Sequence, residues 1–114
     1  MPRWDHFRAH ERYEVQCAAT VRMRHRKLES QGRVENLGLG GAALSLSQPV
    51  RLGEPVSVRF WGDPSVELDG EIAWVTWAAH GGVRAGVRFR VERSATLGDL
   101  LRLIASSATA TEPL

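Results

Sequence analysis

Cysteine is nearly absent from this chain of 114 residues, in which Cys17 is the only thiol. One cysteine cannot form an internal disulfide, which agrees with a protein of a reducing compartment. No apolar run is long enough to cross a membrane, and residues 1–5 (MPRWD) lack the apolar core of a signal peptide. We therefore expect a cytoplasmic protein with no membrane insertion.

Lysine is equally scarce, because Lys27 is the only lysine among 15 basic residues and the others are arginine. Arginine is always charged and can make two parallel hydrogen bonds to a phosphate or to a guanine edge. Genomic base composition explains the overall excess equally well, so only the placement of arginines is informative. The net charge is only +2, which counts against a third interpretation, a small nucleic-acid-binding barrel.

Recognisable catalytic and metal-binding patterns are also missing. No nucleophile, base and orienting acid recur at a known spacing, so the sequence does not indicate an enzyme. His6 and His10 are four residues apart and could share a metal only on a helix, with no cysteine or carboxylate set to complete the site. We expect neither a metal nor another cofactor.

Alternation of apolar and polar residues predicts six short strands, at residues 13–23, 31–35, 42–46, 56–60, 66–74 and 83–91. In the first strand Cys17 falls on the apolar face and is expected to be buried. In the fifth strand Gly70 is expected to mark a bulge or a bend. Trp74 falls on the apolar face of the same strand and is expected in the core.

The period changes at Ser94, a reasonable N-cap, after which Leu97, Leu100, Leu101 and Ile104 recur at helical spacing. The chain length fits one domain. Six strands followed by a helix predict an all-β fold, an antiparallel barrel or closed sandwich with a helix docked at its end. We expect a flexible arm at 1–12, the barrel and helix at 13–105, and a disordered tail at 106–114.

Two short motifs could bind a compact anion. Arg8 and Arg12 lie four residues apart in the arm, and each guanidinium could chelate a phosphate, pair with guanine or stack on a base. Asn36–Gly41 (NLGLGG) is expected to form a turn, because glycine tolerates positive φ angles and lets a ligand approach the backbone. The alternatives are two solvated arginines and an ordinary connection between strands.

Together the two motifs resemble those of the PilZ domain family, R-x-x-x-R on an N-terminal arm and D/N-x-S-x-x-G on a barrel. Residues 8–12 fit the first motif in full, and Asn36 and Gly41 fit the second. Gly38 stands where the family has serine, and residues 85–89 (AGVRF) are similar to the family's late strand. The resemblance implies a six-stranded antiparallel β-barrel with a C-terminal helix that senses cyclic di-GMP.

The resemblance also implies roles for individual residues. Arg8 and Arg12 would clamp phosphate and guanine, Asn36 would hydrogen-bond a guanine, and Gly41 would permit close approach, while Gly38 would leave out one hydroxyl contact. Phe7, before the first motif, adds no charge and favours one bound ligand over a stacked pair. On the polar face of the last strand, Arg84 and Arg88 could extend the positive surface, or could simply be solvated.

The function implied by the resemblance is a non-enzymatic receptor or adaptor. Binding of cyclic di-GMP would rearrange the arm and so regulate a protein partner in motility, biofilm formation or another surface-related process. Gly38 and the four tryptophans leave an alternative open, a degenerate PilZ-like protein–protein interaction module that binds no cyclic di-GMP. Nucleic acid is not an expected partner.

Overall fold

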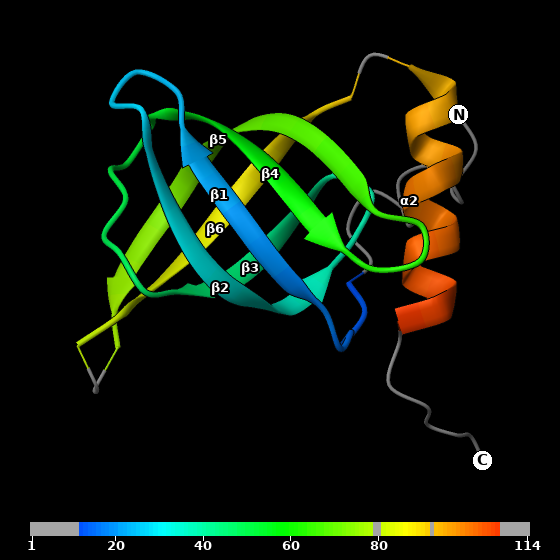
Figure 1. The fold of residues 1–114 in the computed structure, drawn as a ribbon, viewed down its shortest axis with the longest axis horizontal. Coiled ribbons are helices and arrows are strands. Elements are labelled where there is room, and N and C mark those ends of the chain that lie inside the picture. Colours follow the sequence, from blue (N-terminus) through cyan, green and yellow to red (C-terminus); the bar gives the residue numbers. More distant parts are fainter. Residues whose placement is uncertain (1–11, 79–80, 92, 108–114) are drawn as a thin grey trace, which may run out of the picture.

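A computed structural model describes residues 12–78, 81–91 and 93–107 (Figure 1). Its strands are β1 Ala18–Met23, β2 Leu28–Leu37, β3 Gly41–Leu46, β4 Pro55–Trp61, β5 Val66–Trp77 and β6 Val83–Arg90, and its helix is α2 Ser94–Ser107. The predicted order of elements is confirmed, although several strand ends differ. Strand β1 begins after residue 13, whereas β2 begins before residue 31 and β5 continues past residue 74.

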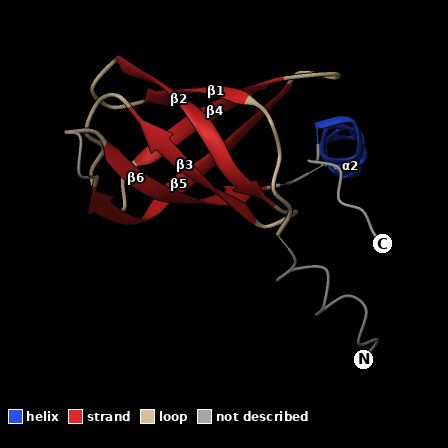
Figure 2. Ribbon diagram, turned by 90° about the horizontal axis from the view of Figure 1, so that it is seen from below, coloured by secondary structure: helices blue, strands red, loops and turns tan. Residues whose placement is uncertain are grey.

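The strands close into an antiparallel barrel in the order β1-β2-β3-β6-β5-β4, as the resemblance implied. Helix α2 lies at one end of this barrel, and the β1–β2 and β5–β6 hairpins lie at the other (Figure 1). A view from below shows the helix standing beyond the strands rather than across their outer surface (Figure 2). The outer wall of the barrel is therefore left uncovered by the helix.

Alternate side chains of each strand fill the barrel interior. Val21, Val58 and Leu44 are completely buried, and Phe60 packs its ring edge-on against Phe89 with centroids 5.8 Å apart. Cys17 belongs to this core, as predicted, and burial raises the pKa of its thiol. Within the described part of the chain, no helix is both long and apolar enough to cross a lipid bilayer.

The prediction of a bulge at Gly70 is wrong, because the irregularity in β5 lies between Ile72 and Trp74. Gly70 keeps regular register opposite Phe89, and a Cβ there would clash with the carbonyl oxygen of Arg88. The extra residue reverses the alternation, so Trp74 faces outward with 39% of its surface exposed. The expectation that Trp74 belongs to the core is therefore also wrong.

A second irregularity lies in β2, where Val34 pairs with Leu44 but Asn36 pairs with Ala43. Val34 and Leu37 are both buried, although strict alternation would put them on opposite faces. The extra residue at Glu35 absorbs the difference and places Asn36 on the outer wall. Without the bulge, Asn36 would face the barrel interior like Val34; with it, the amide faces outward.

Helix α2 buries Leu100, Leu103 and Ile104 against the barrel, whereas Leu101 is 43% exposed. The prediction that Leu101 belongs to the packed face is wrong, and Leu103 was missed. Leu103 sits directly over Gly62, where a Cβ would clash with its side chain. The helix extends to Ser107, past the predicted boundary at residue 105; the rest of the predicted tail, 108–114, lies outside the described residues.

Candidate functional site

The base of the arm is fixed to the end of β2 by a pair of backbone hydrogen bonds. Tyr13 N donates to Leu37 O at 2.9 Å, and Leu37 N donates to Tyr13 O at the same distance. Farther along, Val34 N donates to Cys17 O at 2.9 Å. The segment before β1 therefore runs beside β2, and this places Arg12 next to the turn that follows it.

The side chain of Arg12 joins the two sequence motifs. Its Nη1 donates to Asn36 Oδ1 at 2.8 Å, and its Nη2 lies 3.3 Å from the position that a Cβ on Gly41 would occupy. A guanidinium can only donate, so the amide of Asn36 has to present its oxygen to Arg12. The amide nitrogen of Asn36 consequently points away from Arg12 and keeps its two hydrogens for another acceptor.

The glycine turn is narrower than predicted, because Asn36 and Leu37 still belong to β2. Gly38 N closes it by donating to Gly41 O at 2.9 Å. The positive-φ glycines of the described chain are Gly53 and Gly81, so the expected reason for the glycines of this turn is wrong. Gly41 is required by space instead, because a Cβ would clash with the carbonyl oxygen of Val87.

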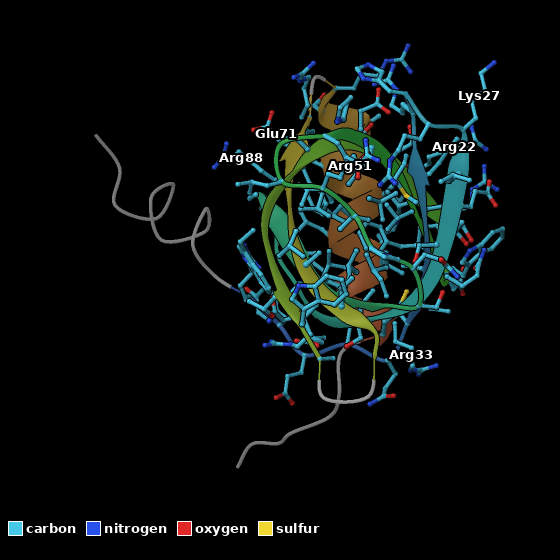
Figure 3. All side chains as sticks on the ribbon, turned by 90° about the vertical axis from the view of Figure 1, so that its left-hand side faces the viewer. Arg22, Lys27, Arg33, Arg51, Glu71 and Arg88 are labelled. Carbon is cyan, nitrogen blue, oxygen red and sulfur yellow. The ribbon has the colours of Figure 1, made fainter. Side chains whose placement is uncertain are left out.

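Arg88 lies directly opposite Gly41 in the β3–β6 ladder. Next to this pair, Phe89 N donates to Gly40 O at 2.9 Å, so β6 is also hydrogen-bonded to the turn before β3. Arg88 Nη1 contacts Glu71 Oε2 at 2.9 Å, and the two side chains lie together on the outer wall (Figure 3). The Arg88 side chain is 67% exposed, so it remains accessible to an anion that approaches Gly41.

Arg84 is more firmly engaged than Arg88. Its Nε and Nη2 donate to Glu35 at 2.8 and 2.6 Å, and Ser45 Oγ donates to the same carboxylate at 2.6 Å. These hydrogen bonds, of which the one from Arg84 has the largest effect, lower the pKa of Glu35 to about 2. The charge of Arg84 is therefore balanced by Glu35, the residue that precedes Asn36.

Trp74 is a member of this surface that the sequence pattern missed. The register of the ladders sets Asn36, Ala43, Gly86 and Trp74 in one row across four neighbouring strands. The indole lies on Gly86, where a Cβ would clash with the ring, and Arg84 Cζ is 5.7 Å from the ring centroid. Between Asn36 and Trp74, this row therefore contains only the small residues Ala43 and Gly86.

The structure brings four of the predicted site residues together, namely Arg12, Asn36, Gly38 and Gly41, and places Arg88 beside them. Arg8 and the metal candidates His6 and His10 lie outside the described residues. In the part of the chain that is described, no group of three or more histidine, cysteine, aspartate or glutamate side chains could hold a metal ion. The arrangement presents hydrogen-bond donors to an anionic ligand.

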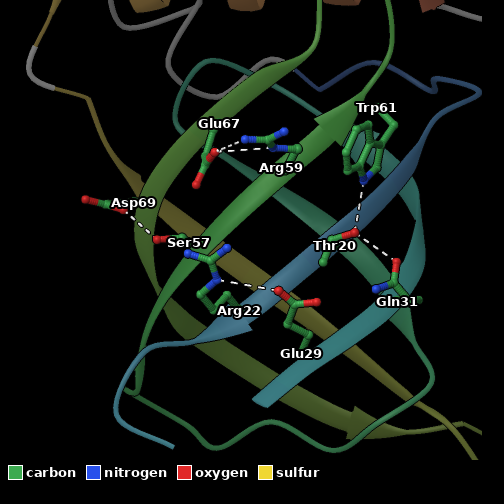
Figure 4. Close-up of polar contacts among 9 residues, drawn as sticks. All are labelled: Thr20, Arg22, Glu29, Gln31, Ser57, Arg59, Trp61, Glu67 and Asp69. Carbon is green, nitrogen blue, oxygen red and sulfur yellow. Dashed lines mark hydrogen bonds and ion pairs between the residues drawn. The ribbon is translucent and has the colours of Figure 1, made fainter. Parts of the chain in front are cut away.

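The other wall of the barrel is also polar but is electrically balanced. A concavity of about 420 Å³ lies over β1, β2, β4 and β5. Within it Arg59 pairs with Glu67 at 2.6 Å and Arg22 pairs with Glu29 at 3.5 Å (Figure 4). Trp61 Nε1 donates to Thr20 Oγ1 at 2.9 Å. With each arginine facing a glutamate, this wall offers no excess positive charge to an anion.

Comparison with known proteins agrees with this geometry. A family model described as PilZ domain matches residues 6–106. No curated protein matches the chain in sequence.

Solved structures share the fold. The PilZ domain of CeSA from a cellulose-synthesizing bacterium is 23% identical with a TM-score of 0.66, over 83% of this chain and 95% of that one. The PilZ domain of YcgR from Escherichia coli, determined with c-di-GMP, is 14% identical with a TM-score of 0.68, over 84% and 88%. The Bacillus subtilis inhibitor of motility, MotI/DgrA, is 13% identical with a TM-score of 0.62, over 80% of this chain and 48% of that one.

These likenesses in fold rest on low sequence identity, whereas the family model covers most of the chain, including both motifs around Arg12 and Asn36. The chain therefore belongs to the PilZ domain family.

Proposed function

We propose that this protein is a cytoplasmic, non-enzymatic receptor for cyclic di-GMP that binds the nucleotide where Arg12, Asn36 and Gly41 meet. The observation that carries the proposal is the contact of Arg12 with both motif positions, 2.8 Å from Asn36 Oδ1 and against Gly41. A related PilZ domain, that of YcgR, has been determined with c-di-GMP. That precedent supports the choice of ligand.

The charge of the site suits a ligand with two phosphates. Arg12 uses one N–H on Asn36 and has other donors left for a phosphate oxygen. Arg88, opposite Gly41, adds a second exposed guanidinium, which also contacts Glu71 at 2.9 Å. We assign to Arg8, by its place in the first motif, the closing contact of the arm over the ligand.

Recognition of the base follows from the orientation of Asn36. Its oxygen is occupied by Arg12, so its amide nitrogen acts as the donor. Guanine offers acceptors at O6 and N7 on one edge, and an amide nitrogen matches that edge.

Binding would act as a switch on the arm. The Tyr13–Leu37 bridge fixes the hinge of the arm, so a ligand held by Arg8 and Arg12 would order the residues before it and create a new surface. A protein partner would read that surface in motility, biofilm formation or another surface-related process. The name of the related MotI/DgrA, an inhibitor of motility, makes motility the first process to examine.

Calorimetric titration with cyclic di-GMP tests the proposal, with GTP as the control nucleotide. We expect saturable binding of one ligand by the native protein and none by the double variant Arg8→Ala/Arg12→Ala. The double variant Arg93→Ala/Arg102→Ala, which removes two arginines from the helix region, should bind normally. Unchanged affinity in the Arg8→Ala/Arg12→Ala protein would exclude the proposed site.

The same titration separates the alternative function. Absence of binding by the native protein would overturn the receptor proposal and favour a protein–protein interaction module. Gly38→Ser restores the hydroxyl of the family motif, and one hydrogen bond contributes about 1 kcal/mol, so we expect affinity to rise by up to about tenfold. Binding by Gly38→Ser alone would mean that the native chain has lost its ligand.

A further inference from the structure

Three large apolar side chains are exposed at the end of the barrel opposite α2. Leu28 is 51% exposed at the start of β2, Leu52 is 72% exposed in the β3–β4 loop, and Trp77 is 72% exposed at the end of β5. Both hairpins and this loop lie at the same end (Figure 1). We call this end, with Leu28, Leu52 and Trp77, the barrel mouth.

Two of these side chains continue the inner face of the barrel beyond its last core layer. Leu28 lies opposite Met23, and Trp77 lies opposite Val83. Paired residues of an antiparallel ladder point to the same face, and both partners are buried. Leu28 and Trp77 are therefore core-facing positions that stay exposed because no further layer of the described residues covers them.

Leu52 is held by a hydrogen-bonded turn. Glu54 N donates to Arg51 O at 3.1 Å, and Gly53 N donates to Ile72 O at 2.7 Å. Gly53 has a φ of 80°, a conformation that glycine adopts without strain. The turn thus presents the leucine to solvent in a fixed position, and little further ordering is needed for it to enter an apolar environment.

Basic side chains surround the mouth. Arg26 is paired with Glu54 at 2.8 Å and also donates to Pro49 O, which ties the β1–β2 hairpin to the β3–β4 loop. Arg51 also interacts electrostatically with Glu54, so that this one carboxylate faces two cations. Lys27 is different, because no ion pair joins it to a carboxylate of the described chain. Lys27 belongs to the β1–β2 hairpin and Arg51 to the β3–β4 loop, and both connections lie at this end of the barrel (Figure 1).

We propose that the barrel mouth docks on the surface of an anionic lipid bilayer. Apolar side chains flanked by more cations than the one carboxylate Glu54 can balance match the boundary of such a bilayer. There tryptophan and leucine enter the headgroup region and cations meet phosphates. The three apolar residues stand on three separate chain segments, and a bilayer accepts them without shaped pockets. An acidic protein surface would attract the same cations but would need a pocket for each apolar side chain.

This contact is peripheral and is independent of the proposed nucleotide site. Gly38 and Gly41 lie in the turn after β2, whereas the β1–β2 hairpin lies before it. A protein docked by its mouth would therefore keep the surface around Asn36 in solution, open to cyclic di-GMP and to a partner.

Co-sedimentation with vesicles tests the inference. The native protein should bind vesicles of phosphatidylcholine and phosphatidylglycerol in equal parts, and should bind vesicles of phosphatidylcholine alone at least about tenfold more weakly. Lys27→Asn/Arg51→Gln and, separately, Leu52→Ser should each reduce binding to the anionic vesicles by about tenfold. All of these positions are exposed, so circular dichroism should show an intact fold.

Matched variants near the opposite end serve as controls. Arg93→Gln/Arg102→Gln removes two cations, and Leu101→Ser removes an exposed leucine from α2; both proteins should bind vesicles like the native chain. Equal losses in mouth and control variants would overturn the inference, as would a complete lack of vesicle binding. If the native chain binds no vesicles and the mouth variants lose binding to an acidic protein, the inference is overturned and that protein is the occupant of the barrel mouth.

Discussion

Arg12 and Asn36, 24 positions apart in sequence, are joined by a hydrogen bond of 2.8 Å from guanidinium to amide oxygen. The bond aligns the two halves of the proposed site, because it holds the arginine over Gly41 and fixes which atom of the amide faces outward. It lies at an exposed position, where a single charged contact adds little to stability. Its main role is therefore to position Arg12 and the amide of Asn36 for the proposed ligand.

Replacing Asn36 by alanine should weaken cyclic di-GMP binding by about tenfold or more, because the ligand loses a donor and Arg12 loses its positioning contact. The melting temperature should change by no more than a few degrees, because the amide lies on the outer wall. Titration calorimetry and thermal unfolding measure the two effects. Gln31→Ala, which removes an exposed amide from the opposite part of β2, is the control; similar affinity losses in both proteins would contradict the assignment.

Gly41→Ala should destabilise the fold by about 2 kcal/mol, because the new Cβ would clash with the carbonyl oxygen of Val87 and force β3 from β6. Gly98→Ala provides a matched comparison, since a Cβ there meets nothing within 4 Å and lies inside α2. That change should stabilise the protein by up to about 1 kcal/mol. Urea unfolding measures the stability of both variants. A Gly41→Ala protein as stable as the native chain would contradict the prediction and show that β3 and β6 can move apart here at little cost.

Glu35 should make the protein sensitive to acid. Its pKa is about 2 in the folded chain against an ordinary 4.5, so its contribution is complete above pH 4.5 and is lost as the pH falls towards 2. The pair with Arg84 is partly exposed, and solvent screening limits the contribution to about 1 kcal/mol. Glu35→Gln should flatten the fall in urea stability across this window, whereas Glu67→Gln on the opposite wall serves as the comparison.

Cys17 should resist alkylation in the folded protein. The thiol is 4% exposed, and burial raises its pKa, so little reactive thiolate forms at mildly alkaline pH. Mass spectrometry after iodoacetamide treatment should show an unmodified native chain and a single adduct once urea has unfolded it. Rapid labelling without urea would mean that the segment before β1 opens on its own.

Much of the barrel could be predicted because most strands obey a simple alternation. The exceptions are the positions where an extra residue reverses the faces, at Glu35 in β2 and between Ile72 and Trp74 in β5. A bulge leaves no signature in a hydrophobic pattern, because a residue of either polarity can occupy it. The alternation therefore assigned Trp74 to the core, and the glycine pattern assigned Asn36 to a turn rather than to the end of β2.

Contacts between distant segments were the other unpredictable part. Arg84 was considered as an extension of the positive surface, but Glu35, 49 positions away, binds it through two nitrogens. On α2 the spacing of leucines allows more than one packed face, and the position of Gly62 decides in favour of Leu103 over Leu101. Sequence spacing indicates which residues share a face of one element but not which element they will meet.

The backbone bond from Gln16 N to Ser107 O, at 2.8 Å, has a mechanical consequence. It fastens residues 13–17, which connect Arg12 to β1, to the final turn of α2, while the neighbouring Val15 and Cys17 are buried in the barrel core. A displacement of these residues would therefore reach both β2, through the Tyr13–Leu37 bridge, and the end of α2, through the bond to Ser107. The exchange rate of the Gln16 amide proton would then report whether the segment before β1 and the end of α2 move together.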